Sequence, residues 1–226
     1  MTPERRRTVD RVLALRQPDL TVLAERLHKP RNLSAVIRTC DAVGIDEVHV
    51  VPGDETPRKH WHTSQGAEKW VAVRAHSDVA AAVKWLRRRG FQLLAAHVCD
   101  GGIDYREADY TQPTALVMGT EAFGVSDEAL RLADQAIFVP MMGMSQSLNV
   151  SVACAVVLYE AQRQRQVAGL YHERRLEDAR YHHLRFQWLH PKLARYCRER
   201  DLDYPPLDED GNLAGPMPRP ADPSSR

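Results

Sequence analysis

The chain has 226 residues, 43% of them hydrophobic, and a formal net charge of +1 at pH 7. This length can bury a proper core, and it fits one domain with extensions or two small domains at most. No apolar run is long enough to span a membrane and no apolar signal core follows the arginine-rich start, so we expect a soluble, cytoplasmic protein.

The near-neutral total hides a segregation of charge along the chain. Residues 1–31 carry eight Lys or Arg against four Asp or Glu, and residues 160–200 carry ten against five. Residues 32–159 carry eleven against fifteen, and residues 201–226 carry two against six. This pattern predicts an acidic catalytic core between basic extensions that bind a polyanion, although two solvated amphipathic helices would give the same charges.

Strands and helices alternate along most of the chain. A first, amphipathic helix is predicted over residues 4–16, and Pro18 ends it. The expected strands are short and apolar, and they occupy Leu20–Leu27, Glu47–Val51, Val71–Val73, Phe91–His97, Thr114–Met118 and Ala136–Val139. The expected helices begin at capping residues, and they run from Asn32 to Val43, from Ser77 to Arg89, from near Ser126, and from Ser147 or Asn149.

These strands lack polar alternation, which is typical of strands buried on both faces. Their alternation with helices predicts an α/β fold with a mostly parallel sheet and helices on both faces. Ligands bind such sheets at the carboxyl ends of strands, so we expect Ala95–Cys99, Met118–Glu121 and Val139–Met144 to form one pocket.

The two ends of the chain follow a different pattern. Residues 173–200 predict one or two basic helices broken near Pro191, and residues 201–226 are expected to be extended or disordered. The cysteines show no paired metal spacing and the histidines no helical i, i+4 spacing. We therefore predict free thiols and no metal site, the cysteines being Cys40, Cys99, Cys154 and Cys197.

Three segments carry the candidate chemistry. In His28–Gly44, HKPRNLSAVIRTCDAVG, Arg38 follows Asn32 by six residues on a helix, where it could also snorkel or pair with an acid. In Pro113–Ser126, PTALVMGTEAFGVS, a strand ends in Gly-Thr-Glu. In Pro140–Glu160, PMMGMSQSLNVSVACAVVLYE, a loop of small residues leads into a helix that is apolar on nearly all sides and is expected to be buried.

In this order the three segments resemble the SpoU family of RNA ribose 2′-O-methyltransferases, in the knotted SPOUT superfamily. The shared patterns are N-x-x-x-x-x-R, a strand ending in G-x-E, and P-M-x-G-x-x-x-S-L-N-V-S. Two further segments, LRQPDLTV at Leu15–Val22 and EAQRQRQVAGLY at Glu160–Tyr171, resemble the branch that methylates guanosine-18 in the D-loop of tRNA. The resemblance covers residues 5–175 well.

The resemblance implies a Rossmann-like sheet with a deep carboxyl-terminal trefoil knot that binds S-adenosylmethionine. The implied cofactor-binding positions are Ala96, Gly119, Val139, Met144 and Leu148. The implied catalytic residue is Arg38, and the active site is completed by Asn32, Glu121, Ser147 and Asn149. The family works as a homodimer, with the helix of the last motif in the interface.

The resemblance also divides the chain into four parts. Residues 1–19 would be a basic helix, 20–166 the methyltransferase domain, 167–200 a basic helical extension and 201–226 an acidic, proline-rich tail. Phosphate contacts of a bound tRNA are expected from Arg5, Arg6, Arg7, Arg11, Arg31, Arg163, Arg165, Arg174 and Arg175.

Two positions depart from the family pattern. Ala96 stands where relatives often carry Thr, so only backbone contacts to the cofactor remain there. Arg31 stands where His is usual, and it adds a phosphate-binding charge near the active site.

We expect Arg38 to stay charged, to clamp a phosphate and to stabilise the developing alkoxide, because arginine is a poor general base. Glu121 is the competing base, or it orients Asn32 and Arg38. Two alternative functions stay open, a ribosomal-RNA ribose methyltransferase and a catalytically inactive RNA-binding relative. A nucleotide-dependent dehydrogenase is disfavoured because no G-x-G-x-x-G follows a predicted strand.

Overall fold

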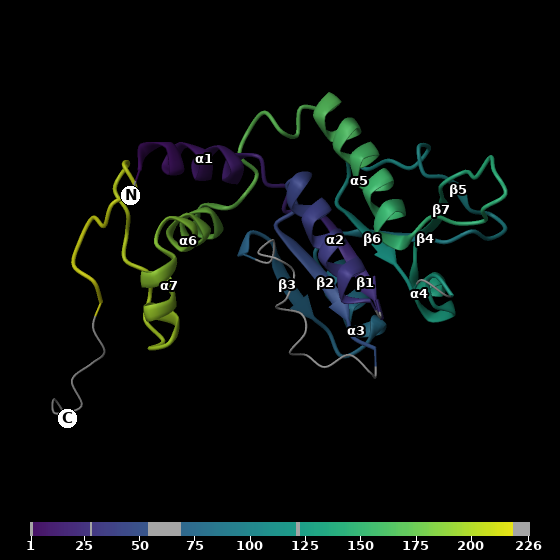
Figure 1. The fold of residues 1–226 in the computed structure, drawn as a ribbon, viewed down its shortest axis with the longest axis horizontal. Coiled ribbons are helices and arrows are strands. Elements are labelled where there is room, and N and C mark those ends of the chain that lie inside the picture. Colours follow the sequence, from purple (N-terminus) through teal and green to yellow (C-terminus); the bar gives the residue numbers. More distant parts are fainter. Residues whose placement is uncertain (1, 28, 54–68, 121–122, 219–226) are drawn as a thin grey trace. The chain divides into compact units, whose positions relative to one another are not determined.

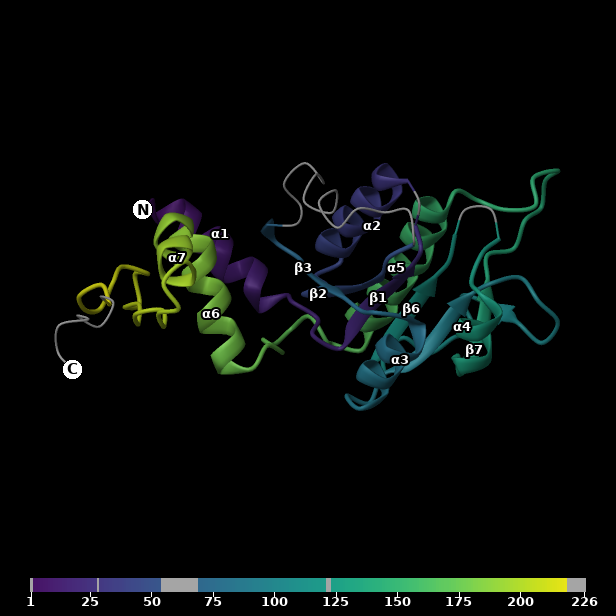
Figure 2. The same cartoon turned by 90° about the horizontal axis from the view of Figure 1, so that it is seen from below.

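The computed structural model describes residues 2–27, 29–53, 69–120 and 123–218. The chain forms two compact units: a terminal unit of Met1–Arg16 and Glu173–Arg226, and a central unit of Gln17–His172. Figures 1 and 2 show the ribbon from two directions.

The central unit alternates strands with helices, as predicted (Figure 1). Its strands are β1 (Leu20–Glu25), β2 (Glu47–Val51), β3 (Ala72–Ala75), β4 (Gln92–Ala96), β5 (Ile103–Asp104), β6 (Thr114–Met118) and β7 (Gln135–Phe138). Its helices are α2 (Pro30–Ala42), α3 (Val79–Arg87), α4 (Asp127–Leu132) and α5 (Val150–Val167).

The seven strands form one sheet in the order β3-β2-β1-β6-β4-β7-β5, and every neighbouring pair is parallel. In the register of β1 with its two neighbours, Leu23 lies beside His49 and Val117. The predicted α/β fold with a parallel sheet is therefore confirmed. Strand order alone does not define a knot, so the trefoil knot stays a prediction.

The sheet is buried on both faces. Successive side chains of a strand point to opposite faces, so Val22 and Ala24 pack in the cluster formed with α2 and α5, whereas Leu23 packs in the cluster formed with α3 and α4. This double burial explains why the strands show no polar alternation in the sequence.

The starts of three helices fix the residues near the edge of the sheet. The prediction that Asn32 caps α2 is wrong: Lys29 is the N-cap and Pro30 takes the first helical position, which the fixed φ of proline favours. Asn32 therefore lies in the first turn, where it is buried. The predicted caps Ser126 and Asn149 do cap α4 and α5, each accepting a backbone N–H with its side-chain oxygen.

Two smaller predictions also needed correction. Asp78, and not Ser77, caps α3: its Oδ1 accepts the N–H of Ala81 at 2.7 Å, and Ser77 donates to its other oxygen. The two-residue strand β5 was not predicted, because so short a segment leaves no pattern in the sequence.

Helix α5 is buried on one side only. Cys154, Leu158 and Ala161 lie in the core, whereas Val152 and Tyr159 are 47% and 52% exposed. The expectation of burial on nearly all sides is therefore wrong for the single chain, because the sheet and α2 cover one side of the helix. An apolar strip is left at the surface.

The cysteines behave as predicted. All four are free, and only Cys99 is partly exposed. Burial raises the pKa of Cys154 to about 12, so this thiol stays protonated.

The terminal unit joins both ends of the chain. Its helices are α1 (Pro3–Ala14), α6 (Asp178–Leu189) and α7 (Pro191–Arg198), the last two separated near Pro191 as predicted. Arg185 of α6 donates to Asp10 of α1 at 2.7 Å and to the carbonyl oxygen of Glu209 at 2.9 Å. The described part of residues 201–226 thus bonds to the helices of this unit.

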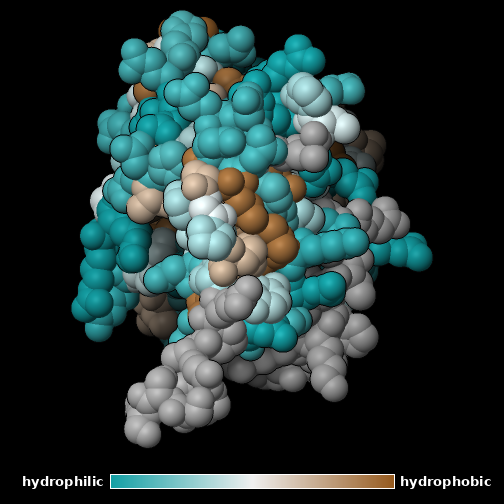
Figure 3. All heavy atoms as spheres, turned by 90° about the vertical axis from the view of Figure 1, so that its left-hand side faces the viewer, coloured by the Kyte–Doolittle hydropathy of each residue, from teal (hydrophilic) through white to brown (hydrophobic). Residues whose placement is uncertain are grey.

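The face drawn in Figure 3 is mostly hydrophilic and carries one small hydrophobic patch. Within the described residues, no helix is long and apolar enough to cross a membrane.

Candidate active site

A cavity of about 520 Å³ opens where β4, β6 and β7 end and α5 begins. This is the edge of a parallel sheet at which ligands bind. The strand ends contribute Ala96, His97, Val98, Met118, Gly119, Thr120, Ile137, Phe138 and Val139. The remaining described lining residues are Lys29, Phe123, Gly124, Met141, Gln146, Ser147, Leu148, Asn149, Val150, Ala153 and Val157.

One wall of the cavity is a tight turn after β6. Thr120 and Gly124 exchange backbone hydrogen bonds of 2.8 and 2.9 Å, and Gly124 has a φ of 70°. A Cβ atom on Gly119 would lie 1.9 Å from the carbonyl oxygen of Gly124, so only glycine fits there. The turn therefore brings bare backbone to the cavity.

The polar end of the cavity joins α2 to α5. The side-chain amide of Asn149 donates to Oδ1 of Asn32 at 3.4 Å, and Oδ1 of Asn149 accepts the N–H of Ser151 at 2.9 Å. One side chain thus caps α5 and contacts the first turn of α2, which holds the two motifs together.

Four of the five predicted cofactor positions line this cavity, namely Ala96, Gly119, Val139 and Leu148. The fifth, Met144, is fully exposed in the loop before α5 and is not a lining residue. The lining combines apolar side chains with the bare backbone at Gly119 and Gly124, which suits a flat, partly apolar molecule.

The predicted catalytic residues fall into three groups. Ser147 and Asn149 line the cavity and Asn32 contacts Asn149. Arg38 lies on the exposed side of α2, two turns beyond Asn32, and does not line the cavity. Glu121 lies outside the described residues.

Most of the predicted RNA-binding arginines are at the surface, and several have protein partners. Arg5, Arg7, Arg11, Arg31, Arg163 and Arg174 are exposed, and Arg6 and Arg175 are half-buried. Arg163 forms an ion pair with Glu160 at 2.7 Å, Arg174 pairs with Asp178, and Arg6 lies 3.6 Å from Asp210.

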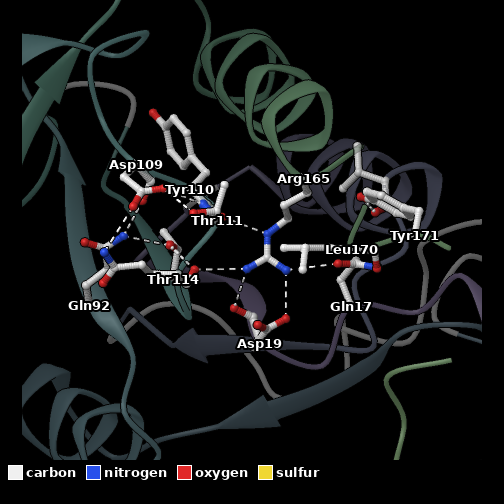
Figure 4. A network of polar contacts seen from close by, with 12 residues as sticks. Gln17, Asp19, Gln92, Asp109, Tyr110, Thr111, Thr114, Arg165, Leu170 and Tyr171 are labelled. Atoms are coloured by element: carbon white, nitrogen blue, oxygen red, sulfur yellow. Dashed lines mark hydrogen bonds and ion pairs between the residues drawn. The ribbon is translucent and has the colours of Figure 1, made fainter. Parts of the chain in front are cut away.

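The assignment of Arg165 to RNA binding is wrong. Its side chain is completely buried, and the guanidinium donates to Asp19 at 2.7 Å and to Gln17 at 3.0 Å (Figure 4). Its other N–H groups donate to the carbonyl oxygens of Asp19, Tyr110 and Gln112. Arg165 therefore anchors α5 to the start of β1 and to the loop before β6, and it has no surface to offer to RNA.

One residue of the cavity was not predicted: Lys29 belongs to the first motif but was given no role. His97 and Thr120 lie one and two residues beyond the ends of β4 and β6, within the segments expected to form the pocket, and both line the cavity. The rule that ligands lie beyond strand ends identified these two segments. Lys29 could not be found in this way, because the start of α2 was placed too late.

Comparisons with known proteins agree with this geometry. The family model described as "SpoU rRNA Methylase family" matches residues 19–159, and "SpoU, rRNA methylase, C-terminal" matches residues 163–216. The chain is 47% identical over 215 residues to the tRNA (guanosine(18)-2′-O)-methyltransferase of Escherichia coli K12, covering 94% of each chain. It is 53% identical over 189 residues to the Thermus thermophilus enzyme of the same name, covering 83% of this chain and 97% of that enzyme.

Solved structures show the same similarity. The crystal structure of the A. aeolicus TrmH/SpoU tRNA modifying enzyme superposes with a TM-score of 0.73 at 35% identity, covering 89% of this chain and 98% of that one. The SpoU methyltransferase AviRb from Streptomyces viridochromogenes, in complex with the cofactor AdoMet, gives a TM-score of 0.60 at 30% identity and covers 67% and 62%.

Proposed function

The chain belongs to the SpoU methylase family, and on that premise we propose that it transfers a methyl group from S-adenosylmethionine to the ribose 2′-hydroxyl of guanosine-18 in the D-loop of tRNA. The observation that carries this proposal is that relatives named for this reaction match the chain through both units. Since tRNA is the substrate, we place the activity in the cytoplasm.

The cavity fits the cofactor that the family uses. Its volume lies in the range of small-molecule sites, and its wall at Gly119 is backbone that no side chain could replace. Ala96, Val139 and Leu148 would hold the adenosine part largely through backbone groups and apolar contact. When bound, the cofactor supplies an electrophilic methyl group.

The residues at the polar end of the cavity would act on the RNA. The 2′-oxygen must lose its proton and align with the methyl group, and positioning alone supplies much of the rate. Ser147 and Asn149 can hold the ribose hydroxyl by hydrogen bonds, and Asn32 fixes the amide of Asn149. Arg38 would stay charged, contact a phosphate and stabilise the negative charge that develops on the 2′-oxygen.

The position of Arg38 supports a homodimer. Six residues of helix separate it from Asn32, which is about 9 Å along the axis of α2. Apolar side chains on the exposed side of α5 recur with helical spacing at Val152, Val156 and Tyr159. We propose that this strip is buried against a second copy, whose Arg38 then acts at the cavity of the first.

Two experiments test the dimer. The double variant Val152→Glu, Tyr159→Glu should sediment as a monomer, with Tyr159→Phe as the conservative control that stays dimeric. Mixing inactive Arg38→Ala with inactive Asn149→Ala should restore activity, because some mixed dimers contain one complete site. A monomeric wild-type chain with full activity would refute the proposal.

The reaction itself is tested by transfer of labelled methyl to an unmodified tRNA transcript, beside the same transcript with 2′-deoxyguanosine at position 18. Activity should vanish with the deoxy substrate and with Arg38→Ala. Activity that survives the deoxy substitution would mean another target nucleotide. Transfer to ribosomal RNA alone would support the first alternative, and no transfer at all would support an inactive RNA-binding protein.

A further inference from the structure

The described lining of the cavity contains a single lysine or arginine and no aspartate or glutamate. That residue is Lys29, and the other described lining residues are apolar, polar or histidine. Within the described residues Lys29 also forms no ion pair with a carboxylate. Among the residues that the structure describes, no carboxylate thus neutralises this exposed ammonium group at the cavity.

The backbone of Lys29 is held firmly in place. Its carbonyl oxygen accepts the N–H of Asn32 at 2.9 Å, and Pro30 fixes the first helical residue after it. The side chain of Asn32 in turn accepts the amide of Asn149. Lys29 therefore belongs to the polar end of the cavity, with Ser147 and Asn149, and its backbone is fixed there by the first turn of α2.

We propose that Lys29 binds an anionic oxygen at the mouth of the cavity, and that this oxygen belongs to a phosphate of the target RNA strand. The inference rests on the proposed function. A lysine side chain is a flexible point charge that suits a phosphate, and Lys29 is an exposed residue of the cavity lining. The carboxylate of the cofactor offers the same chemistry, so the experiment must separate the two sources.

The experiment compares Lys29→Met and Lys29→Arg with wild type. Lys84→Met is the matched control, because Lys84 is an exposed lysine on α3, which packs against the other face of the sheet. Binding of unmodified tRNA is measured with saturating S-adenosylhomocysteine at several salt concentrations. Binding of S-adenosylhomocysteine alone is measured by calorimetry.

For a phosphate contact, Lys29→Met should reduce the slope of log affinity against log salt by about 1 and leave the affinity for S-adenosylhomocysteine unchanged. Lys29→Arg should restore the slope, and Lys84→Met should match wild type. A weaker affinity for S-adenosylhomocysteine with an unchanged slope would assign the same anion-binding role to the cofactor carboxylate.

An unchanged slope together with an unchanged affinity in Lys29→Met would overturn the inference. Methyl transfer by the wild-type chain is measured in parallel. Its absence would refute the proposed function, whereas an unaffected Lys29→Met variant of an active enzyme would refute only the role of Lys29.

Discussion

Replacing Arg165 by methionine should destabilise the chain strongly, although this residue sits in a basic segment that looks like solvent-exposed charge. The guanidinium is fully buried and donates to Asp19, Gln17 and three backbone carbonyl oxygens (Figure 4). Methionine would fill most of the volume but would remove the charged donor to the Asp19 carboxylate and the donor to the carbonyl oxygen of Tyr110. The carbonyl oxygens of Asp19 and Gln112 would keep their bonds from the N–H and the hydroxyl of Thr114.

The expected cost follows from the burial of the two partners. Removing one member of a buried ion pair costs about 3–5 kcal/mol. The side chain of Asp19 is 18% exposed, so water can reach it after the substitution. We therefore expect a value near the lower end, about 3 kcal/mol of unfolding free energy. Arg163→Met is the matched control: the side chain of Arg163 is 63% exposed and pairs with Glu160, and loss of such a surface pair should change the stability little.

The assay is urea unfolding at pH 7, followed by far-ultraviolet circular dichroism, with the slope compared between variants. The salt dependence of tRNA binding should be reduced by Arg163→Met and not by Arg165→Met, because only Arg163 has an exposed side chain that can make the proposed phosphate contact. Equal stability of Arg165→Met and Arg163→Met would refute the structural role given to Arg165.

Three further predictions follow from the geometry. Burial lowers the pKa of His49 to about 3, so below the ordinary histidine pKa the unfolded chain binds a proton that the folded chain does not. The free energy of unfolding should therefore fall by roughly 2 kcal/mol from pH 7 to pH 5. Urea unfolding measures this change, and the His49→Gln variant should lose most of it. Gly119→Ala should weaken S-adenosylhomocysteine binding by calorimetry at least about 10-fold, because its Cβ would clash with backbone, whereas Gly143→Ala, with nothing within 4 Å, should bind normally. Asn149→Asp keeps the acceptor that caps α5 but loses the donor to Asn32, so this variant should keep its melting temperature and lose methyl transfer. Asn149→Ala loses both groups, so it should also lose about 1 kcal/mol of stability. An active Asn149→Asp variant would contradict the role of that donor.

The sheet was predictable because its signals are local. A strand such as Thr114–Met118 is an uninterrupted apolar run between polar turns, and its bounds agree with the prediction. The caps Ser126 and Asn149 were identified for the same reason, because a cap depends on residues within one turn. The start of α2 was misplaced because both Lys29–Pro30 and Asn32 are acceptable helix starts in the sequence.

The errors at the candidate site have long-range causes. Arg165 is buried by Asp19, which lies 146 residues earlier in the chain, so no local pattern distinguishes it from the exposed Arg163. Whether Arg38 reaches a cavity depends on the proposed contact with a second copy of the chain, and no local sequence pattern specifies that contact. Lys29 was missed because its role depends on where α5 begins in space, which its own motif does not encode.

The hydrogen bond from the side chain of Gln17 to the carbonyl oxygen of Leu170, 2.9 Å long, closes the central unit at its two ends. In sequence, that unit is an insertion: it interrupts a smaller fold whose two halves are Met1–Arg16 and Glu173–Arg226. A domain inserted with its ends together can be removed or rejoined without breaking its own core. The terminal unit has no such independence, because its two halves bury each other's apolar side chains. Val9 and Leu13 of α1 are buried, as are Leu184 and Trp188 of α6, and deleting either half would expose those of the other. The two halves of the terminal unit therefore depend on each other for their folding.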